Sequence, residues 1–178
     1  MDYQSIIDTY YPAGTALRDI YMRHCKSVAD EALAIARRKS LPLSPDDIRA
    51  AAMLHDIGIT ATYAPGIGCR GAAPYLLHGI IGADMLRAMG VDERFARVAE
   101  RHTGSGITAG EIEAAAMPLP RRDLLPETLL ERLICYADKF YSKSGRMERK
   151  DPAKVEAQMA RFGEGSMQRF RALSAEFG

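Results

Sequence analysis

Residues 51–59 read Ala51-Ala52-Met53-Leu54-His55-Asp56-Ile57-Gly58-Ile59, and they place a histidine and an aspartate side by side within an apolar run. The apolar neighbours predict that this segment is buried. A buried carboxylate that faces neither a charge nor a metal is strongly destabilising, so we expect a cation to face Asp56. For this dipeptide alone, a hydrogen-bonded core histidine beside a local helix cap remains the alternative.

Hydrophobic periodicity is helical along nearly all of the chain around this segment. One long amphipathic helix is predicted over residues 15–39. The sequence Ser44-Pro45-Asp46-Asp47 predicts the start of a second helix, with a capping serine and proline at the first helical position, that runs to about Asp56. Further helices are predicted over residues 75–89, 92–102, 108–117 and 127–141, with two amphipathic stretches in the tail.

Two segments between these helices carry turn-forming residues. Residues 59–74 are rich in glycine and proline and are predicted to form an irregular loop, and residues 118–126 are predicted to form a proline-rich linker. Apolar and polar residues alternate over no more than a few positions anywhere. The fold class is therefore predicted to be all-α, and residues 1–178 are treated as a single domain.

Every histidine of the chain and two aspartates fall on the apolar faces of five of the predicted helices. A lone histidine in such a position is more often a hydrogen-bonded core residue, but six converging groups indicate a metal site. Imidazole and carboxylate ligands without thiolate favour Mn²⁺, Fe²⁺, Zn²⁺, Co²⁺ or Mg²⁺. Six ligands are too many for one ion that leaves a position open to substrate, so two divalent metal ions are expected. The six residues are His24, His55, Asp56, His78, His102 and Asp138.

The order of these ligands, H…HD…H…H…D, resembles that of the HD-domain superfamily of metal-dependent phosphohydrolases, and residues 55–58 look like its HDIG variant. The resemblance covers roughly residues 15–143, and residues 144–178 would form a C-terminal helical extension. It implies an all-α bundle of five core helices around the metal centre, with additional helices at the C-terminus.

The resemblance also implies a role for each ligand. His24, His55, Asp56 and Asp138 would bind a first metal ion. His78 and His102 would complete the site of a second. Asp56 would bridge the two ions and orient the attacking hydroxide.

The function implied by this resemblance is hydrolysis of a small phosphate ester, such as a nucleotide or a related phosphomonoester or diester. The Gly-Tyr-Pro motif and double histidine of the cyclic-di-GMP phosphodiesterase branch are missing, because Arg101-His102-Thr103-Gly104 stands at the corresponding place. One alternative is a mixed-valent di-iron oxygenase acting on an inositol- or phosphonate-type substrate, since such enzymes use the same ligand order. A non-catalytic ligand-sensing domain is disfavoured because every ligand position is filled.

A substrate phosphate also needs hydrogen-bond donors from the protein. Neighbouring residues on a helix point about 100° apart, so for Lys139 and Arg101 solvated surface charge is the alternative interpretation. Residues 66–71 are rich in glycine but lack the Gly-Lys-Ser/Thr of a P-loop, and we predict that they form a lid. The candidate donors are Lys139, Lys143, Arg101, Thr103 and Arg70.

Composition limits the partners and the compartment. A net charge of +1 gives no overall attraction to nucleic acid or to an anionic membrane, so we expect a phosphorylated small molecule as the partner. The apolar stripes of the tail predict packing on the core or a homodimer contact. Three cysteines without C-x-x-C spacing, together with the lack of a signal-peptide pattern, lead us to expect a cytoplasmic location.

Overall fold

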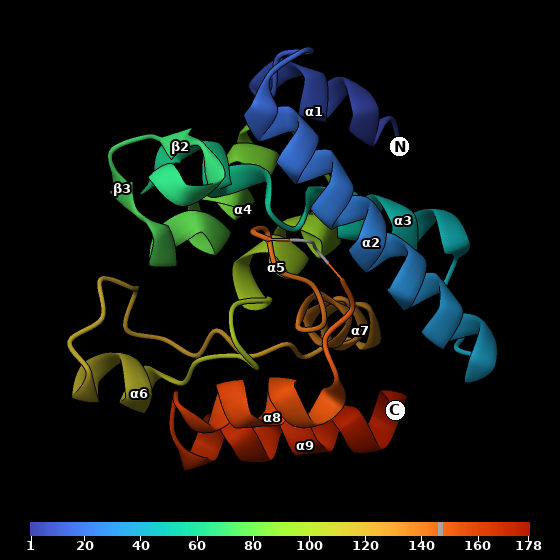
Figure 1. The fold of residues 1–178 in the computed structure, drawn as a ribbon, viewed down its shortest axis with the longest axis vertical. Coiled ribbons are helices and arrows are strands. Elements are labelled where there is room, and N and C mark those ends of the chain that lie inside the picture. Colours follow the sequence, from blue (N-terminus) through green and yellow to red (C-terminus); the bar gives the residue numbers. More distant parts are fainter. Residues whose placement is uncertain (146–147) are drawn as a thin grey trace.

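Nine α-helices and one small sheet form the part of the chain that the computed structural model describes, residues 1–145 and 148–178 (Figure 1). This architecture confirms the predicted all-α fold class. The predicted extension over residues 144–178 contains residues 146–147, which lie outside the described residues. In chain order the α-helices are α1 (Tyr3–Tyr10), α2 (Ala16–Arg38), α3 (Pro45–Leu54), α4 (His78–Ala88), α5 (Glu93–Arg101), α6 (Ala109–Ala114), α7 (Leu129–Asp138), α8 (Pro152–Ala160) and α9 (Glu164–Phe177).

The two helices nearest the His-Asp pair are close to their predicted bounds. Helix α2 begins after Thr15, whose side chain caps it by accepting a hydrogen bond from the Arg18 amide. Helix α3 ends at Leu54, two residues early, because the chain tightens into a 3-10 helix, η1 (Ile57–Ala61). Ser44 stands at the N-cap of α3, but its side chain accepts no cap hydrogen bond from the described backbone.

Residues 59–74 are more ordered than the predicted irregular loop. They contain a three-stranded sheet in the order β2-β1-β3, with β1 antiparallel to β2 and parallel to β3. Strands of two or three residues are too short to show alternation in a sequence. The elements of this region are η1, β1 (Thr62–Ala64), η2 (Pro65–Ile67), β2 (Cys69–Arg70), β3 (Ala73–Pro74) and η3 (Tyr75–Leu77).

The core gathers helices from both ends of the chain. Helix α2 packs on α3 and α7, whereas α4 packs on α5 and η1. Figure 1 shows α8 and α9 lying along one side of the bundle, next to α7. The apolar stripes of the tail pack on this core, since Val155, Phe170 and Phe177 are buried in the same cluster as residues of α2 and α7. The homodimer contact stays a prediction.

A close backbone approach joins η1 to α4 and brings the two halves of the site together. A Cβ atom on Gly58 would lie 2.2 Å from the carbonyl oxygen of His78 and 2.4 Å from the amide nitrogen of Gly82. Only glycine fits there. Because Asp56 directly precedes η1 and His78 begins α4, this contact fixes the separation of the two residues.

None of the described helices is both long enough and apolar enough to cross a membrane.

Candidate metal centre

Five of the six predicted ligands lie at or just beyond the end of a helix. His55 and His102 are the C-cap residues of α3 and α5, His78 is the first residue of α4, and Asp138 is the last residue of α7. Asp56 follows His55 directly, and His24 lies within α2. All six side chains are buried and converge at the centre of the bundle.

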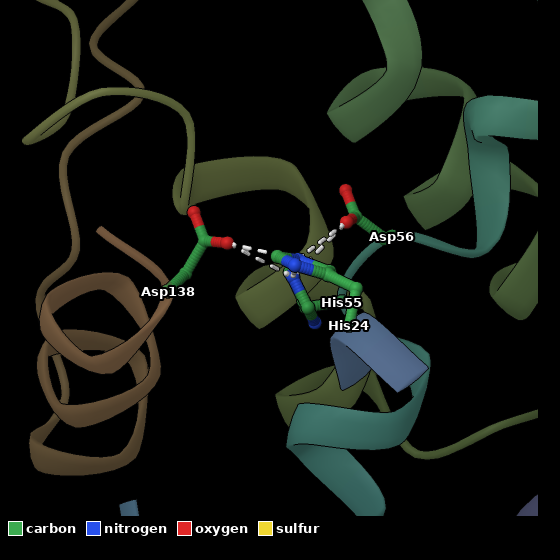
Figure 2. Close-up of side chains that lie close together, drawn as sticks. All are labelled: His24, His55, Asp56 and Asp138. Atoms are coloured by element: carbon green, nitrogen blue, oxygen red, sulfur yellow. Dashed lines mark hydrogen bonds and ion pairs between the residues drawn. The ribbon is translucent and has the colours of Figure 1, made fainter. Parts of the chain in front are cut away.

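The first group consists of His24, His55, Asp56 and Asp138. Figure 2 shows the two imidazoles lying between the two carboxylates. The Nε2 atom of His24 is 3.1 Å from Asp56 Oδ2 and 3.1 Å from Asp138 Oδ1. The Nε2 atom of His55 is 3.2 Å and 3.4 Å from the same two oxygens. These four side chains come from α2, the end of α3 and the end of α7, so the fold itself assembles the group.

The second group consists of His78, His102 and the other oxygen of the same aspartate. Asp56 Oδ1 is 3.5 Å from His78 Nε2 and 3.4 Å from His102 Nε2. Asp56 therefore directs one oxygen to each group. Within each group the ligand atoms lie within 4.8 Å of one another. This is the arrangement expected of a carboxylate shared by two metal ions.

Backbone hydrogen bonds define which ring nitrogen of three histidines is available. The Nδ1–H of His55, His78 and His102 donates to the carbonyl oxygen three residues earlier, at 2.7, 2.7 and 2.8 Å. In a neutral imidazole the Nε2 atom then presents a lone pair. Such bonds are the usual way in which a protein orients a metal-binding histidine.

Two pairs of these nitrogens face each other at short range. The Nε2 atoms of His78 and His102 are 3.0 Å apart, and those of His24 and His55 are 3.3 Å apart. The lone pairs of His78 and His102 repel unless a proton or a metal ion lies between them. Asp56 Oδ1 is buried without a hydrogen bond from the described residues, whereas Oδ2 lies 2.7 Å from the Lys143 ammonium. The nitrogen and oxygen donors therefore fit divalent metal ions of the borderline to hard class.

Two lysines neutralise the carboxylates of the site. Lys143 Nζ is 2.7 Å from Asp56 Oδ2, and Lys139 Nζ is 2.6 Å from Asp138 Oδ2. Burial on its own would raise the pKa of both carboxyl groups, but Lys143 next to Asp56 and Lys139 next to Asp138 hold each pKa well below its usual range. Burial, with His102 adding to it, lowers the pKa of His78 to about 3. Ionised carboxylates and a neutral imidazole are the forms that bind metal ions.

Two cavities open beside the centre. The first, which we call the lysine cavity, has a volume of about 450 Å³, and its lining includes Asp138, Lys139, Lys143 and Lys150. The second, which we call the apolar cavity, has a volume of about 400 Å³, and its lining includes His78. Tyr75, Lys139 and Met159 line both. Each cavity thus reaches a ligand of a different metal group, and both volumes are in the range of small-molecule sites.

The structure places the five predicted phosphate donors in different surroundings. Lys139 and Lys143 line the lysine cavity, and Thr103 lines the apolar cavity. Lys139 is only 9% exposed and also donates to the carbonyl oxygen of His102, so it is not a solvated surface charge.

The other two donors are directed elsewhere. The guanidinium of Arg101 donates to the carbonyl oxygen of Leu125 at 3.1 Å and pairs with Glu127 at 2.8 Å. Arg70 lies exposed in β2. Among the described residues, neither arginine lines a cavity of the centre. The loop before α4 contributes Gly66 and Ile67 to the lysine cavity instead, and its role as a lid stays a prediction.

Two features of the site were not anticipated from the sequence. The ring of Tyr75 stacks on the imidazole of His78, with centroids 4.8 Å apart. Lys150 reaches the lysine cavity from beyond α7. Tyr75 stands three residues before His78, and this helical spacing places the two side chains on the same side. Nothing in the sequence around Lys150 indicates that its side chain reaches the cavity.

Comparisons with known proteins agree with this geometry. A family model described as the HD domain matches residues 21–142. An uncharacterised protein of Methanocaldococcus jannaschii is 35% identical over 136 residues, which cover 75% of this chain and 73% of that protein. No solved structure matches the chain.

Two longer relatives carry a different activity in their names. Both are described as tRNA (cytidine(56)-2'-O)-methyltransferase. The protein of Thermoplasma volcanium is 32% identical over 147 residues, and the protein of Picrophilus torridus is 36% identical over 124 residues. The matches cover 83% and 70% of this chain but only 38% and 32% of those proteins. A methyltransferase name does not fit a phosphohydrolase.

Proposed function

This chain belongs to the HD domain family, and on that premise we propose that it hydrolyses a small phosphate ester, a nucleotide or a related compound, at a centre of two divalent metal ions. One observation carries the proposal: Asp56 directs its two oxygens to two separate clusters of histidine nitrogens. When bound, two such ions lower the pKa of a water molecule and neutralise charge on a phosphoryl group. Hydrolysis forms a bond from water oxygen to phosphorus and breaks the ester P–O bond.

Hydrogen bonds within this chain hold the histidine and aspartate side chains in the orientation that metal binding needs. Carbonyl oxygens near the ends of α3, η3 and α5 fix three imidazoles with Nε2 pointing inward. Lys139 holds both Asp138 and the backbone of His102, and so ties the first group to the second. We therefore assign Lys139 as a positioning residue.

The lysine cavity supports an anionic substrate. Three lysine side chains line it, of which Lys139 is paired with Asp138 and Lys143 with Asp56. Lys150 donates to the carbonyl oxygen of Lys139 at 3.2 Å, which places its ammonium beside the same pocket. Charge-assisted hydrogen bonds from Lys143 and Lys150 to phosphate oxygens would orient the ester phosphorus toward the ligands of the first group.

The proposal is tested with a panel of nucleoside monophosphates, glycerol phosphate and an aryl phosphate, assayed with Mn²⁺ and with Zn²⁺. We expect phosphate release, and its loss in Asp56→Asn. Lys150→Met is expected to raise KM about tenfold, the effect of one charge-assisted hydrogen bond. Lys154→Met is the matched control, because Lys154 is exposed on α8. Metal-loaded protein that releases no phosphate from any ester would contradict the proposal.

The oxygenase alternative shares the ligand set, so the panel is repeated in iron-loaded protein with and without O₂. Substrate-dependent O₂ uptake without phosphate release would establish that alternative. Because two relatives are named as tRNA methyltransferases, tRNA is included among the substrates. We expect no reaction with it, since the net charge of +1 provides no general attraction to a polyanion.

A further inference from the structure

The apolar cavity has a different chemical character from the lysine cavity beside it. Its lining includes the apolar side chains of Leu76, Ile107, Met117, Met159 and Phe162. Three charged side chains also line it, and each is ion-paired: Glu111 and Arg169 pair with each other at 2.8 Å, and Lys139 pairs with Asp138 at 2.6 Å. The cavity therefore carries little net charge and favours an uncharged, largely apolar group.

This cavity lies beside the proposed catalytic centre. It includes His78, a ligand of the second metal group, and it shares Tyr75, Lys139 and Met159 with the lysine cavity. The two cavities are therefore neighbours, and a molecule that spans both would place its anionic end among the lysines and its uncharged end among the apolar side chains.

Part of the wall comes from residues outside the segment that the HD family model matches. Met159 lies in α8, Phe162 follows it, and Ser166 and Arg169 lie in α9, whereas the matched residues are 21–142. Figure 1 shows α8 and α9 lying below α7. The C-terminal helices of this chain therefore complete the wall of the cavity.

The polar groups of the lining favour a heterocyclic ring over an alkyl chain. Thr103 adds a hydroxyl group to the Glu111–Arg169 pair, whereas the Ser166 hydroxyl is hydrogen-bonded to Ser105 at 3.0 Å, so the lining offers both donors and acceptors beside apolar faces. Phe162 is 64% exposed, so its ring stands at the mouth of the cavity and is free to stack. An apolar face with a hydrogen-bonding edge is the chemistry of a nucleobase.

From these observations we infer that the apolar cavity binds the nucleobase of a nucleoside monophosphate whose phosphate lies in the lysine cavity. This inference deepens the proposed function and rests on it for the phosphate. Phe162 stacks on the base at the entrance, while Met117 and Met159 contact it from within. The C-terminal helices then select nucleotides over small phosphate esters that lack a ring.

The first test compares Phe162→Ala with wild type on nucleoside monophosphates and on glycerol phosphate. We expect kcat/KM for the nucleotides to fall about tenfold, the loss of one base–aromatic stack, with no change for glycerol phosphate. Phe162→Tyr keeps the ring and should behave as wild type. The matched control is Tyr63→Ala, because Tyr63 is 63% exposed on β1 and, within the described residues, lines neither cavity.

The second test does not depend on catalysis. Binding of the free nucleosides adenosine, guanosine, cytidine and uridine to metal-free protein is measured by saturation-transfer NMR, with hexanol as the alkyl comparison. We expect at least one nucleoside to bind and Phe162→Ala to weaken it. Nucleoside binding without any phosphate release would leave the cavity assignment standing and overturn the hydrolase. Phosphate release from nucleotides that Phe162→Ala does not affect, or preference for hexanol, would overturn the nucleobase assignment.

Discussion

Replacing Gly58 with alanine tests the contact that holds the two halves of the centre together. The added methyl group would lie 2.2 Å from the carbonyl oxygen of His78 and 2.4 Å from the amide nitrogen of Gly82. Both are backbone atoms, so no side-chain rotation relieves the overlap. The 3-10 helix η1 must instead move away from α4 by about 1 Å to reach ordinary van der Waals contact.

The size of the effect follows from this overlap. Overpacking a core typically costs about 1–3 kcal/mol, and a clash with backbone on two sides belongs at the upper end, about 3 kcal/mol. For a chain of this size, each kcal/mol lowers Tm by about 2–4 °C, so we predict a loss of about 6–12 °C. Metal affinity should fall as well, since Asp56 and His78 flank the contact and would separate.

The assay is thermal unfolding followed by circular dichroism, together with metal content after dialysis. Gly66→Ala is the matched control, because a Cβ atom at Gly66 meets no described atom within 4 Å and its backbone has no left-handed φ. Its Tm should change by less than about 2 °C, given that exposed substitutions usually stay within about 0.5 kcal/mol. A Gly58→Ala protein with the same Tm as wild type and the same metal content after dialysis would refute the reasoning.

Two further predictions concern stability. Burial alone would raise the pKa of Glu100, but Arg122 and Arg87 hold that pKa below its usual range. Because the folded pKa is below the unfolded one, Glu100 stabilises the fold above about pH 5, and this contribution is lost as the pH falls toward 3. The Tm of Glu100→Gln should therefore fall less than the Tm of wild type when the pH is lowered from about 5 toward 3. An equal fall in both proteins would show that the ion pairs of Glu100 with Arg122 and Arg87 do not stabilise the fold. Thr108 and Glu111 form a capping box at α6. Thr108→Ala should cost about 1 kcal/mol in chemical denaturation, and no loss would show that α6 does not depend on its cap.

The sequence predicts best where one periodic pattern is long. Helix α2 has 23 residues, and its bounds are within one residue of the prediction. The N-terminal helix α1 was missed, because eight residues containing Ile6 and Ile7 give too short a pattern to recognise. The small sheet was missed for the same reason: strands of two or three residues are formed by tertiary contacts.

For the metal ligands, the sequence predicts which residues converge but not how their side chains are oriented. The convergence of the six residues follows from their apolar surroundings, but three of the histidines lie at helix ends, where a helical face is no longer defined. What orients them is the bond from Nδ1 to a carbonyl oxygen three residues earlier. That detail depends on how the chain turns after each helix, which composition and spacing do not specify.

The candidate phosphate donors show that a residue next to a metal ligand in the sequence does not always face the site. Arg101 and Lys139 each stand next to a ligand. Arg101 is the last residue of α5 and reaches toward Glu127, whereas Lys139 lies just beyond α7 and turns inward to Asp138. Lys150 comes from a segment after α7, and only the folded chain brings it to the cavity.

The central claim, a centre for two metal ions that share Asp56, is tested most directly by the number of ions bound per chain. Protein loaded with Mn²⁺ or Zn²⁺ and dialysed is analysed by plasma mass spectrometry. We predict two ions per wild-type chain, one in His24→Ala, one in His102→Ala, and fewer than one in Asp56→Asn. A wild-type chain that binds a single ion, or variants of His24 and His102 that both keep two, would contradict it.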